Sequence, residues 1–133
     1  MLDVSIRTSI LNLLIKIAEN ESLAMVYISH DLSTIGHVCS RTAIMYLGKI
    51  VETDPTEDLI NHPFHPYVDA LLSSVPVPDP TYHRERVKFS GEIVAPIDLP
   101  KGCRFEPRCS KVSKICQEAM PILRNIGNGH YVA

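Results

Sequence analysis

The sequence predicts an α/β protein followed by a small, irregular extension that contains cysteines. Two observations favour the α/β part: apolar residues recur at helical spacing after Asp3, and an unbroken apolar run, Leu23 to Ile28, comes next. A third observation marks the extension, because the chain becomes rich in proline, glycine and cysteine after Val75. With 133 residues, 45% hydrophobic and 21% charged, the chain suffices for one modest globular unit with an appendage.

Charge and hydropathy exclude several classes of protein. The net charge is −2 and lysines and arginines are scattered, so we expect no nucleic acid partner and no direct attraction to anionic lipid. No apolar stretch reaches the roughly 18 to 20 residues that cross a bilayer. Met1-Leu2-Asp3 also lacks the basic start of a signal peptide. We therefore expect an intracellular protein whose link to a membrane runs through a partner.

The first helix is predicted from Val4 to Asn20. Its apolar stripe follows the helical period and consists of Ile10, Leu11, Leu14, Ile17 and Ala18. Asp3 stands just before it, where a carboxylate caps the helix and faces the positive end of its dipole. The run Leu23 to Ile28 then fits a strand buried on both faces, as in a parallel sheet with helices on each side.

The middle of the chain is predicted to form a hairpin and two short helices. Arg41–Leu47 and Ile50–Thr53 are expected to pair about Gly48-Lys49, since glycine supplies the backbone freedom of a tight turn. Asp54–Asp58 opens a short helix, because proline and acidic residues suit a first turn. His65–Ser73 is expected to form the next helix.

His30 is the candidate site residue of this predicted fold. It follows Ile28 by two residues, and ligands of open α/β sheets bind beyond the carboxyl ends of the parallel strands. Asp31 or Ser33 then caps a short helix. An imidazole at this point can donate a hydrogen bond to a phosphate oxygen. On position alone, a histidine that only bonds a backbone carbonyl of its loop is the stronger interpretation.

Several stretches resemble the dipeptide/oligopeptide (and nickel) ABC ATPase family. They are Asp3 to Ser5, Tyr27 to Leu32, and Met45 to Glu52. His65 to Pro80 resembles the segment that marks the peptide-transporter branch, and Gly102 to Cys109 resembles its C-terminal extension. The resemblance covers essentially the whole chain. It implies the C-terminal part of a P-loop NTPase sheet of the ABC ATPase type.

The same resemblance implies roles for two residues. His30 would be the switch histidine that contacts the γ-phosphate of ATP, and Asp3 would end the D-loop at the interface between two ATPase subunits. The parent protein would bind ATP and Mg²⁺ and hydrolyse ATP. It would work with permease subunits at the inner face of the cell membrane and import peptides or a related solute, whose identity depends on other subunits.

The residues that wrap nucleotide phosphates are not in this sequence. It contains no Gly-x-x-x-x-Gly-Lys-Ser/Thr loop, and it lacks the family's signature motif and Walker B acids. We therefore expect a fragment, truncated or started internally, that alone neither binds nor hydrolyses ATP. The strand Leu23 to Ile28 would then present an apolar edge, so we also expect self-association.

Cys103, Cys109 and Cys116 are candidate metal ligands. Their spacing is neither a zinc-finger pair nor a ferredoxin run, and zinc or an iron–sulfur cluster needs about four ligands. In the family that the chain resembles, some members carry a [4Fe–4S] cluster here, with a fourth ligand that this chain lacks. For the chain itself, free or partly disulfide-bonded thiols are the favoured interpretation. Cys39 is expected to be a small core residue, and His130 to pack on the cysteine region.

We expect three parts: residues 1–74 from the nucleotide-binding domain, a proline-rich linker at 75–86, and the extension at 87–133, with a strand from Val87 to Ile93. A rival interpretation stays open, in which the chain is a stand-alone regulatory or metal-binding interaction module. Upstream DNA that encodes a Gly-Lys-Ser/Thr loop in frame favours the ATPase fragment, whereas an authentic start at Met1 favours the rival.

Overall fold

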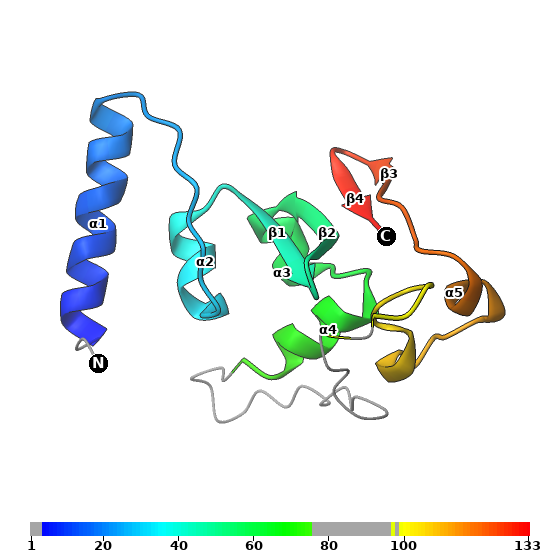
Figure 1. The fold of residues 1–133 in the computed structure, drawn as a ribbon. Coiled ribbons are helices and arrows are strands. Elements are labelled where there is room, and N and C mark those ends of the chain that lie inside the picture. The colour runs from blue at the N-terminus through cyan, green and yellow to red at the C-terminus, as the bar shows by residue number, and fades with distance from the viewer. Residues whose placement is uncertain (1–3, 76–96, 98) are drawn as a thin grey trace. The chain divides into compact units, whose positions relative to one another are not determined.

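The computed structural model describes residues 4–75, 97 and 99–133. Within it the chain divides into two compact units, Met1–Cys39 and Ser40–Ala133 (Figure 1). Asp3, most of the proline-rich linker and the strand expected from Val87 to Ile93 lie outside the described residues. In the described part, no helix is long and apolar enough to cross a membrane.

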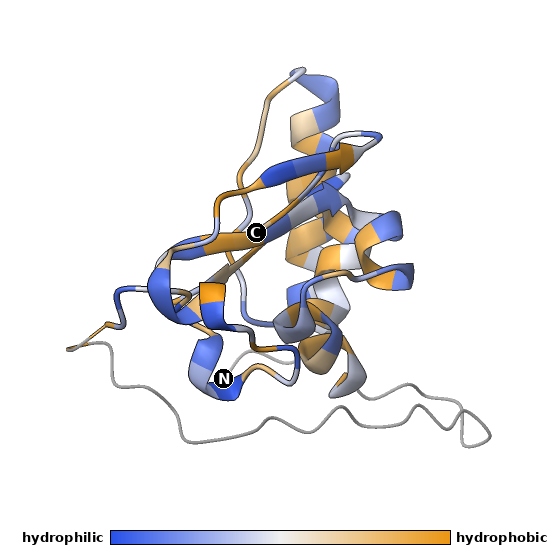
Figure 2. Ribbon diagram, turned by 90° about the vertical axis from the view of Figure 1, so that its right-hand side faces the viewer, coloured by the Kyte–Doolittle hydropathy of each residue, from blue (hydrophilic) through white to orange (hydrophobic). Residues whose placement is uncertain are grey.

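Two helices make up the first unit. Helix α1 (Val4–Asn20) has the bounds that the sequence predicts, and α2 (Leu32–Val38) follows the predicted cap. The end of α1 is closed by the Leu23 N–H, which donates to the Ala18 carbonyl at 2.8 Å while Ser22 takes a left-handed conformation (φ 51°). Hydrophobic residues lie along much of α1 (Figure 2).

The strand predicted from Leu23 to Ile28 is wrong. These residues have no regular secondary structure, and the side chains of Val26 and Ile28 are 88% and 91% exposed. A strand is defined by hydrogen bonds to a neighbouring strand, and no described segment pairs with this one. The apolar run thus predicted a burial that the described chain does not supply.

The second unit is built on a four-stranded sheet. Its strands are β1 (Arg41–Tyr46), β2 (Lys49–Pro55), β3 (Arg124–Gly127) and β4 (His130–Val132), in the order β1-β2-β4-β3. Every neighbouring pair is antiparallel, so the parallel sheet expected from the sequence is not the sheet observed here. The β1–β2 and β3–β4 pairs are hairpins joined by short turns, which makes those two pairs antiparallel.

The β1–β2 hairpin confirms the predicted pairing. Its turn residues Leu47 and Gly48 both have positive φ (44° and 77°), which matches the twist of the strands that they join. Along β1, Thr42, Ile44 and Tyr46 are buried, while the residues between them are exposed. This period of two turns one face of the hairpin toward the core.

Two helices predicted from the sequence pack into this core. Helix α3 (Thr56–Asn61) contributes Leu59, and α4 (Pro66–Ser73) contributes Val68 and Leu72. The core is completed from the extension by Phe105, which is 2% exposed and precedes the short 3-10 helix η1 (Glu106–Arg108). The extension therefore shares one hydrophobic core with the hairpin instead of forming a separate one.

The extension also contains a helix, α5 (Lys114–Glu118), and the β3–β4 hairpin. The sequence pattern predicts little regular structure here, and this hairpin is not among the predicted elements. The signal was available: Asn128-Gly129 lies between two short β-prone segments, and both residues adopt positive φ (51° and 77°). An Asn-Gly pair flanked in this way is a strong local indication of a hairpin.

Candidate functional site

The loop that carries His30 is the candidate site suggested by the sequence. His30 is exposed at a bend directly before α2, and no described residue hydrogen bonds to its ring. Asp31 follows it and caps α2: its Oδ1 accepts a hydrogen bond from the Ser33 N–H at 3.1 Å and another from the Ser33 hydroxyl at 2.5 Å. The predicted cap is confirmed.

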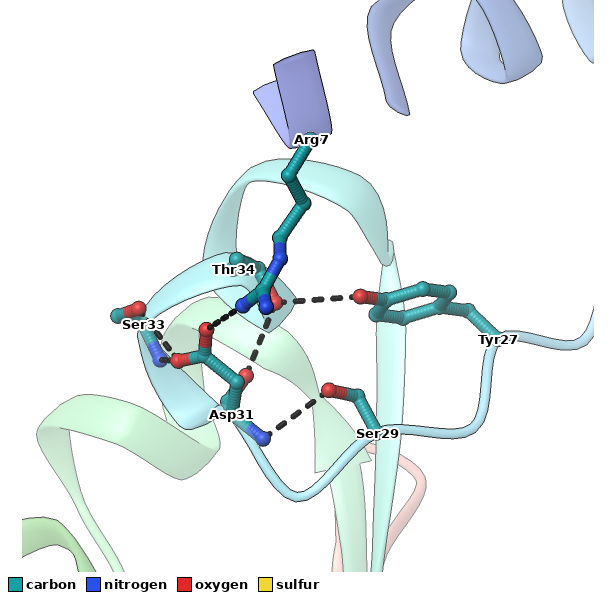
Figure 3. Close-up of polar contacts among 6 residues, drawn as sticks. All are labelled: Arg7, Tyr27, Ser29, Asp31, Ser33 and Thr34. Atoms are coloured by element: carbon teal, nitrogen blue, oxygen red, sulfur yellow. Dashed lines mark hydrogen bonds and ion pairs between the residues drawn. The ribbon is translucent and has the colours of Figure 1, made fainter. Parts of the chain in front are cut away.

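Asp31 also fixes the loop on its other sides (Figure 3). Its Oδ2 lies 3.2 Å from the Arg7 guanidinium of α1, and its N–H donates to the Ser29 hydroxyl at 3.0 Å. The Thr34 hydroxyl donates to the Asp31 carbonyl at 2.9 Å. The hydrogen bond from the Ser33 side chain lowers the pKa of Asp31, with the Ser33 N–H, Arg7 and His30 acting in the same direction.

This network determines how His30 is presented. Ser29 and Asp31 hold the backbone on both sides of it, while its imidazole faces solvent. A second link between α1 and α2 joins His37 Nε2 to the Asn12 side chain at 3.0 Å. An exposed imidazole on a restrained loop can bond to an anion without reorganising the backbone.

The three cysteines of the extension are neighbours. The Cys103 N–H donates to the Cys116 carbonyl at 2.7 Å, and Gly102 permits this approach, because a Cβ there would lie 2.2 Å from the same carbonyl oxygen. Burial raises the pKa of the Cys103 thiol, and the nearby thiols of Cys116 and Cys109 raise it further. The Cys109 sulfur accepts the Lys111 N–H at 3.3 Å.

These thiols do not fit a metal ion as they are arranged. Across the described residues, no group of three or more His, Cys, Asp or Glu side chains is placed to hold one. All four cysteines, Cys39 included, are free thiols, and the raised pKa of Cys103 disfavours the thiolate form in which that residue would bind a metal. Cys39 was expected to be a core residue, and in the structure its side chain is only partly buried.

A buried cluster that was not predicted from the sequence lies on β2. Glu52 is fully buried, and its carboxylate accepts the N–H groups of Phe64 and His65, both at 2.9 Å. The same carboxylate lies 2.7 Å from His130 Nε2, and Asp54 lies 2.9 Å from His130 Nδ1. His130 was expected on the cysteine region but instead joins β4 to β2. The predicted strand ended at Thr53, whereas the observed strand continues to Pro55, so Asp54 lies two residues after Glu52 on the same face.

A group of aromatic rings surrounds Phe105. The rings of Tyr46, Tyr67 and His65 lie with centroids 5.2, 5.4 and 5.6 Å from it. His65 caps α4 by accepting the Tyr67 N–H on Nδ1 at 3.1 Å, and burial lowers its pKa to about 4. A neutral imidazole is required for that acceptor role.

Comparison with known proteins covers both units. Residues 51–116 match the family model of the oligopeptide/dipeptide transporter C-terminal region. Over 99% of its length the chain is 43% identical to the dipeptide transport ATP-binding protein DppF of Haemophilus influenzae. It is 42% identical, again over 99%, to the probable peptide ABC transporter ATP-binding protein y4tS of Sinorhizobium fredii. The chain covers 40% and 37% of these two relatives, which is less than half of their length.

Both relatives are named as ATP-binding proteins of dipeptide or peptide transporters, and the chain is similar to one part of them. More narrowly, the chain belongs to the dipeptide/oligopeptide transport ATP-binding family and corresponds to the C-terminal part of those proteins. The segment matched by the family model contains Glu52, the His65-Pro66-Tyr67 turn and the three neighbouring cysteines.

Proposed function

We propose that this chain is the C-terminal part of the ATP-hydrolysing subunit of an ABC importer for peptides or a related solute. The observation that carries the proposal is the exposed imidazole of His30, held on a restrained loop in a chain that aligns throughout with such subunits. In the complete subunit, His30 donates a hydrogen bond to the γ-phosphate of ATP, and Asp3 stands at the interface with the second ATPase subunit. Residues 1–74 belong to the C-terminal part of the nucleotide-binding domain, residues 75–86 link it to the extension, and residues 87–133 form that extension.

The chemistry follows from the loop. A protonated ring nitrogen donates to a phosphate oxygen, and its contribution grows as charge shifts onto that oxygen. Asp31 and Ser29 keep the backbone of the loop in place, so little order is lost on binding. ATP and Mg²⁺ are held by other parts of the subunit. The assembled transporter also contains permease subunits, which keep this subunit at the inner face of the membrane.

Substitution of His30 in the longer subunit tests the proposal. His30→Ala is expected to lower ATP hydrolysis about a hundredfold, which is the usual loss for one donor to developing charge. His37→Ala is the matched control, because His37 is also exposed and bonds only to Asn12 among the described residues. Equal activity of the two variants would refute the role of His30.

The chain alone is proposed to be inactive, because it lacks the phosphate-binding loop and the Walker B acids. Calorimetric titration of the purified chain with MgATP is expected to show no saturable binding at micromolar concentration. Saturable binding would contradict this part of the proposal while leaving the family relationship intact.

Self-association is also proposed for the isolated chain. The side chains of Ile6, Ile10 and Leu13 are 50%, 44% and 58% exposed along a shallow groove on α1. Val26 and Ile28 are almost completely exposed as well. Exposed apolar side chains of this kind favour association. A clean monomer in light scattering at high concentration would exclude it.

A second candidate function is a metal-binding or iron–sulfur module in the extension. It is supported by the proximity of the cysteine-bearing segments, since the Cys103 N–H donates to the Cys116 carbonyl at 2.7 Å. The thiols would have to rearrange around the metal, because in the described residues they do not form a metal site. An absorbance band near roughly 400 nm in anaerobically prepared protein would identify an iron–sulfur cluster. The same spectrum without that band, together with free thiols on titration, would reject this function for the chain.

A further inference from the structure

The Glu52–His130–Asp54 cluster has an unusual requirement for protons. Carboxylate oxygens only accept hydrogen bonds, and a neutral imidazole has a single N–H. Yet both ring nitrogens of His130 lie within hydrogen-bond distance of a carboxylate, Nε2 at 2.7 Å and Nδ1 at 2.9 Å. With both carboxylates ionised, the two contacts are favourable together only if the ring is the doubly protonated imidazolium.

Burial makes this requirement energetically important. Glu52, Asp54 and His130 are 0%, 2% and 7% exposed. Buried charges are tolerated when they are paired and hydrogen bonded, and breaking such a pair leaves an uncompensated charge. The Glu52 carboxylate is further stabilised by hydrogen bonds from the N–H groups of Phe64 and His65. Asp54 depends more heavily on the charge of His130, which lies 2.9 Å away, since no described residue donates a hydrogen bond to the Asp54 side chain.

The β3–β4 hairpin depends on this cluster. All four residues of β3 are exposed, and His130 is the buried residue of β4. The register between β2 and β4 covers two pairs, Glu52 with Val132 and Thr53 with Tyr131, and the Ala133 N–H adds one bond to the Val51 carbonyl at 2.9 Å. Such short pairing gives little independent stability to a hairpin.

We propose that the Glu52–His130–Asp54 cluster is a proton-dependent latch, which holds the β3–β4 hairpin on β2 while the imidazole carries two protons and releases it when one is lost. After that loss, one carboxylate faces a nitrogen lone pair and is left buried without its donor. The latch therefore closes on the acidic side and opens as the pH rises.

The charged and titratable groups around the latch are few. Glu52 and Asp54 face the ring from β2, and the His65 N–H meets Glu52 from the start of α4. From β1, the Arg41 guanidinium donates to the Gly129 carbonyl in the hairpin turn. From β3, Arg124 is exposed and in register with Val132. The edge of the Phe64 ring closes the remaining side, with centroids 5.1 Å apart.

The Asp54→Asn variant separates the latch from a merely structural contact. A neutral His130 satisfies this variant fully, because Nε2–H donates to Glu52 and Nδ1 accepts from the asparagine amide. Its hairpin should therefore stay closed at alkaline pH, where the wild-type hairpin opens. Thr53→Val is the matched control, since Thr53 lies on the same strand but is only half-buried and alternates to the other face.

Two NMR measurements on the 133-residue chain test the proposal. The first measures hydrogen exchange of the backbone amides in residues 124–133, corrected for the intrinsic exchange rate. In wild type and Thr53→Val, the protection factors should fall about tenfold between about pH 6 and about pH 9. In Asp54→Asn they should not fall. The imidazole ¹⁵N spectrum of wild type should show two protonated nitrogens at the lower pH. The latch would be overturned if wild-type protection did not change with pH, if Asp54→Asn lost as much protection as wild type, or if a ring nitrogen of His130 were unprotonated at the lower pH. The ¹⁵N result decides even if a variant fails to fold.

Discussion

Phe105→Ala is the change expected to affect the second unit most. The Phe105 side chain is 2% exposed and touches rings from β1, α4 and the turn before α4. Truncating a buried phenylalanine to alanine costs about 3 to 5 kcal/mol through lost transfer free energy and the cavity left behind. Three edge-on or tilted ring contacts are lost together here, so we expect a value near the upper end.

Urea denaturation followed by circular dichroism measures the effect. With a denaturant dependence of roughly 1 to 2 kcal/mol per molar urea for a unit this small, the unfolding midpoint should fall by about 2 M or more. Ile115→Ala is the control, because Ile115 is 69% exposed and its loss should change the free energy of unfolding by less than about 0.5 kcal/mol. If Phe105→Ala shifted the midpoint no more than Ile115→Ala, the extension would not share a core with the hairpin, and the reasoning would fail.

Three further predictions concern single positions. Asp31→Ala removes the cap of α2 and the Arg7 contact, and it should cost about 1 kcal/mol while loosening the His30 loop, measured by amide exchange at Ser33. Gly102→Ala forces a Cβ to within 2.2 Å of the Cys116 carbonyl and should destabilise the extension by about 1 to 3 kcal/mol, seen as faster thiol labelling of Cys103. His65 has its pKa lowered to about 4, so the folded state favours its neutral form. Stability from this group is present above about pH 6.5 and is lost as the pH falls toward 4, by roughly 3 kcal/mol at most; acid titrations of wild type and His65→Asn should differ in that window.

Local signals were sufficient for most of the described elements. Helix α1 follows from its apolar period, the cap of α2 from Asp31, and the β1–β2 hairpin from Gly48, because each depends on residues close together in sequence. The start of α4 at His65-Pro66 was predictable for the same reason. The Asn128-Gly129 turn carried an equally local signal that was overlooked.

Long-range pairing explains the rest. Leu23 to Ile28 has the composition of a buried strand, but strand formation depends on a partner that composition does not specify. The sheet order brings β4 beside β2, so Glu52 and His130 meet although 78 residues separate them. No local pattern predicts that meeting. The sequence could have indicated only that a partner is needed, because two acidic residues on the buried face of β2 require a positively charged group nearby.

Glu52 on β2 therefore positions three separate parts of the second unit: the start of α4, the C-terminal hairpin and the cysteine-bearing segment. Its carboxylate receives the Phe64 and His65 N–H groups, which places the start of α4, and it receives His130, which places the C-terminal hairpin. Once α4 is placed, Tyr67 and His65 line the position that Phe105 fills, so the cysteine-bearing segment is positioned by the same anchor. Removing this carboxylate should consequently disturb α4, the Phe105 contacts and the hairpin together, whereas Asp54→Asn should affect only the pH dependence of the hairpin.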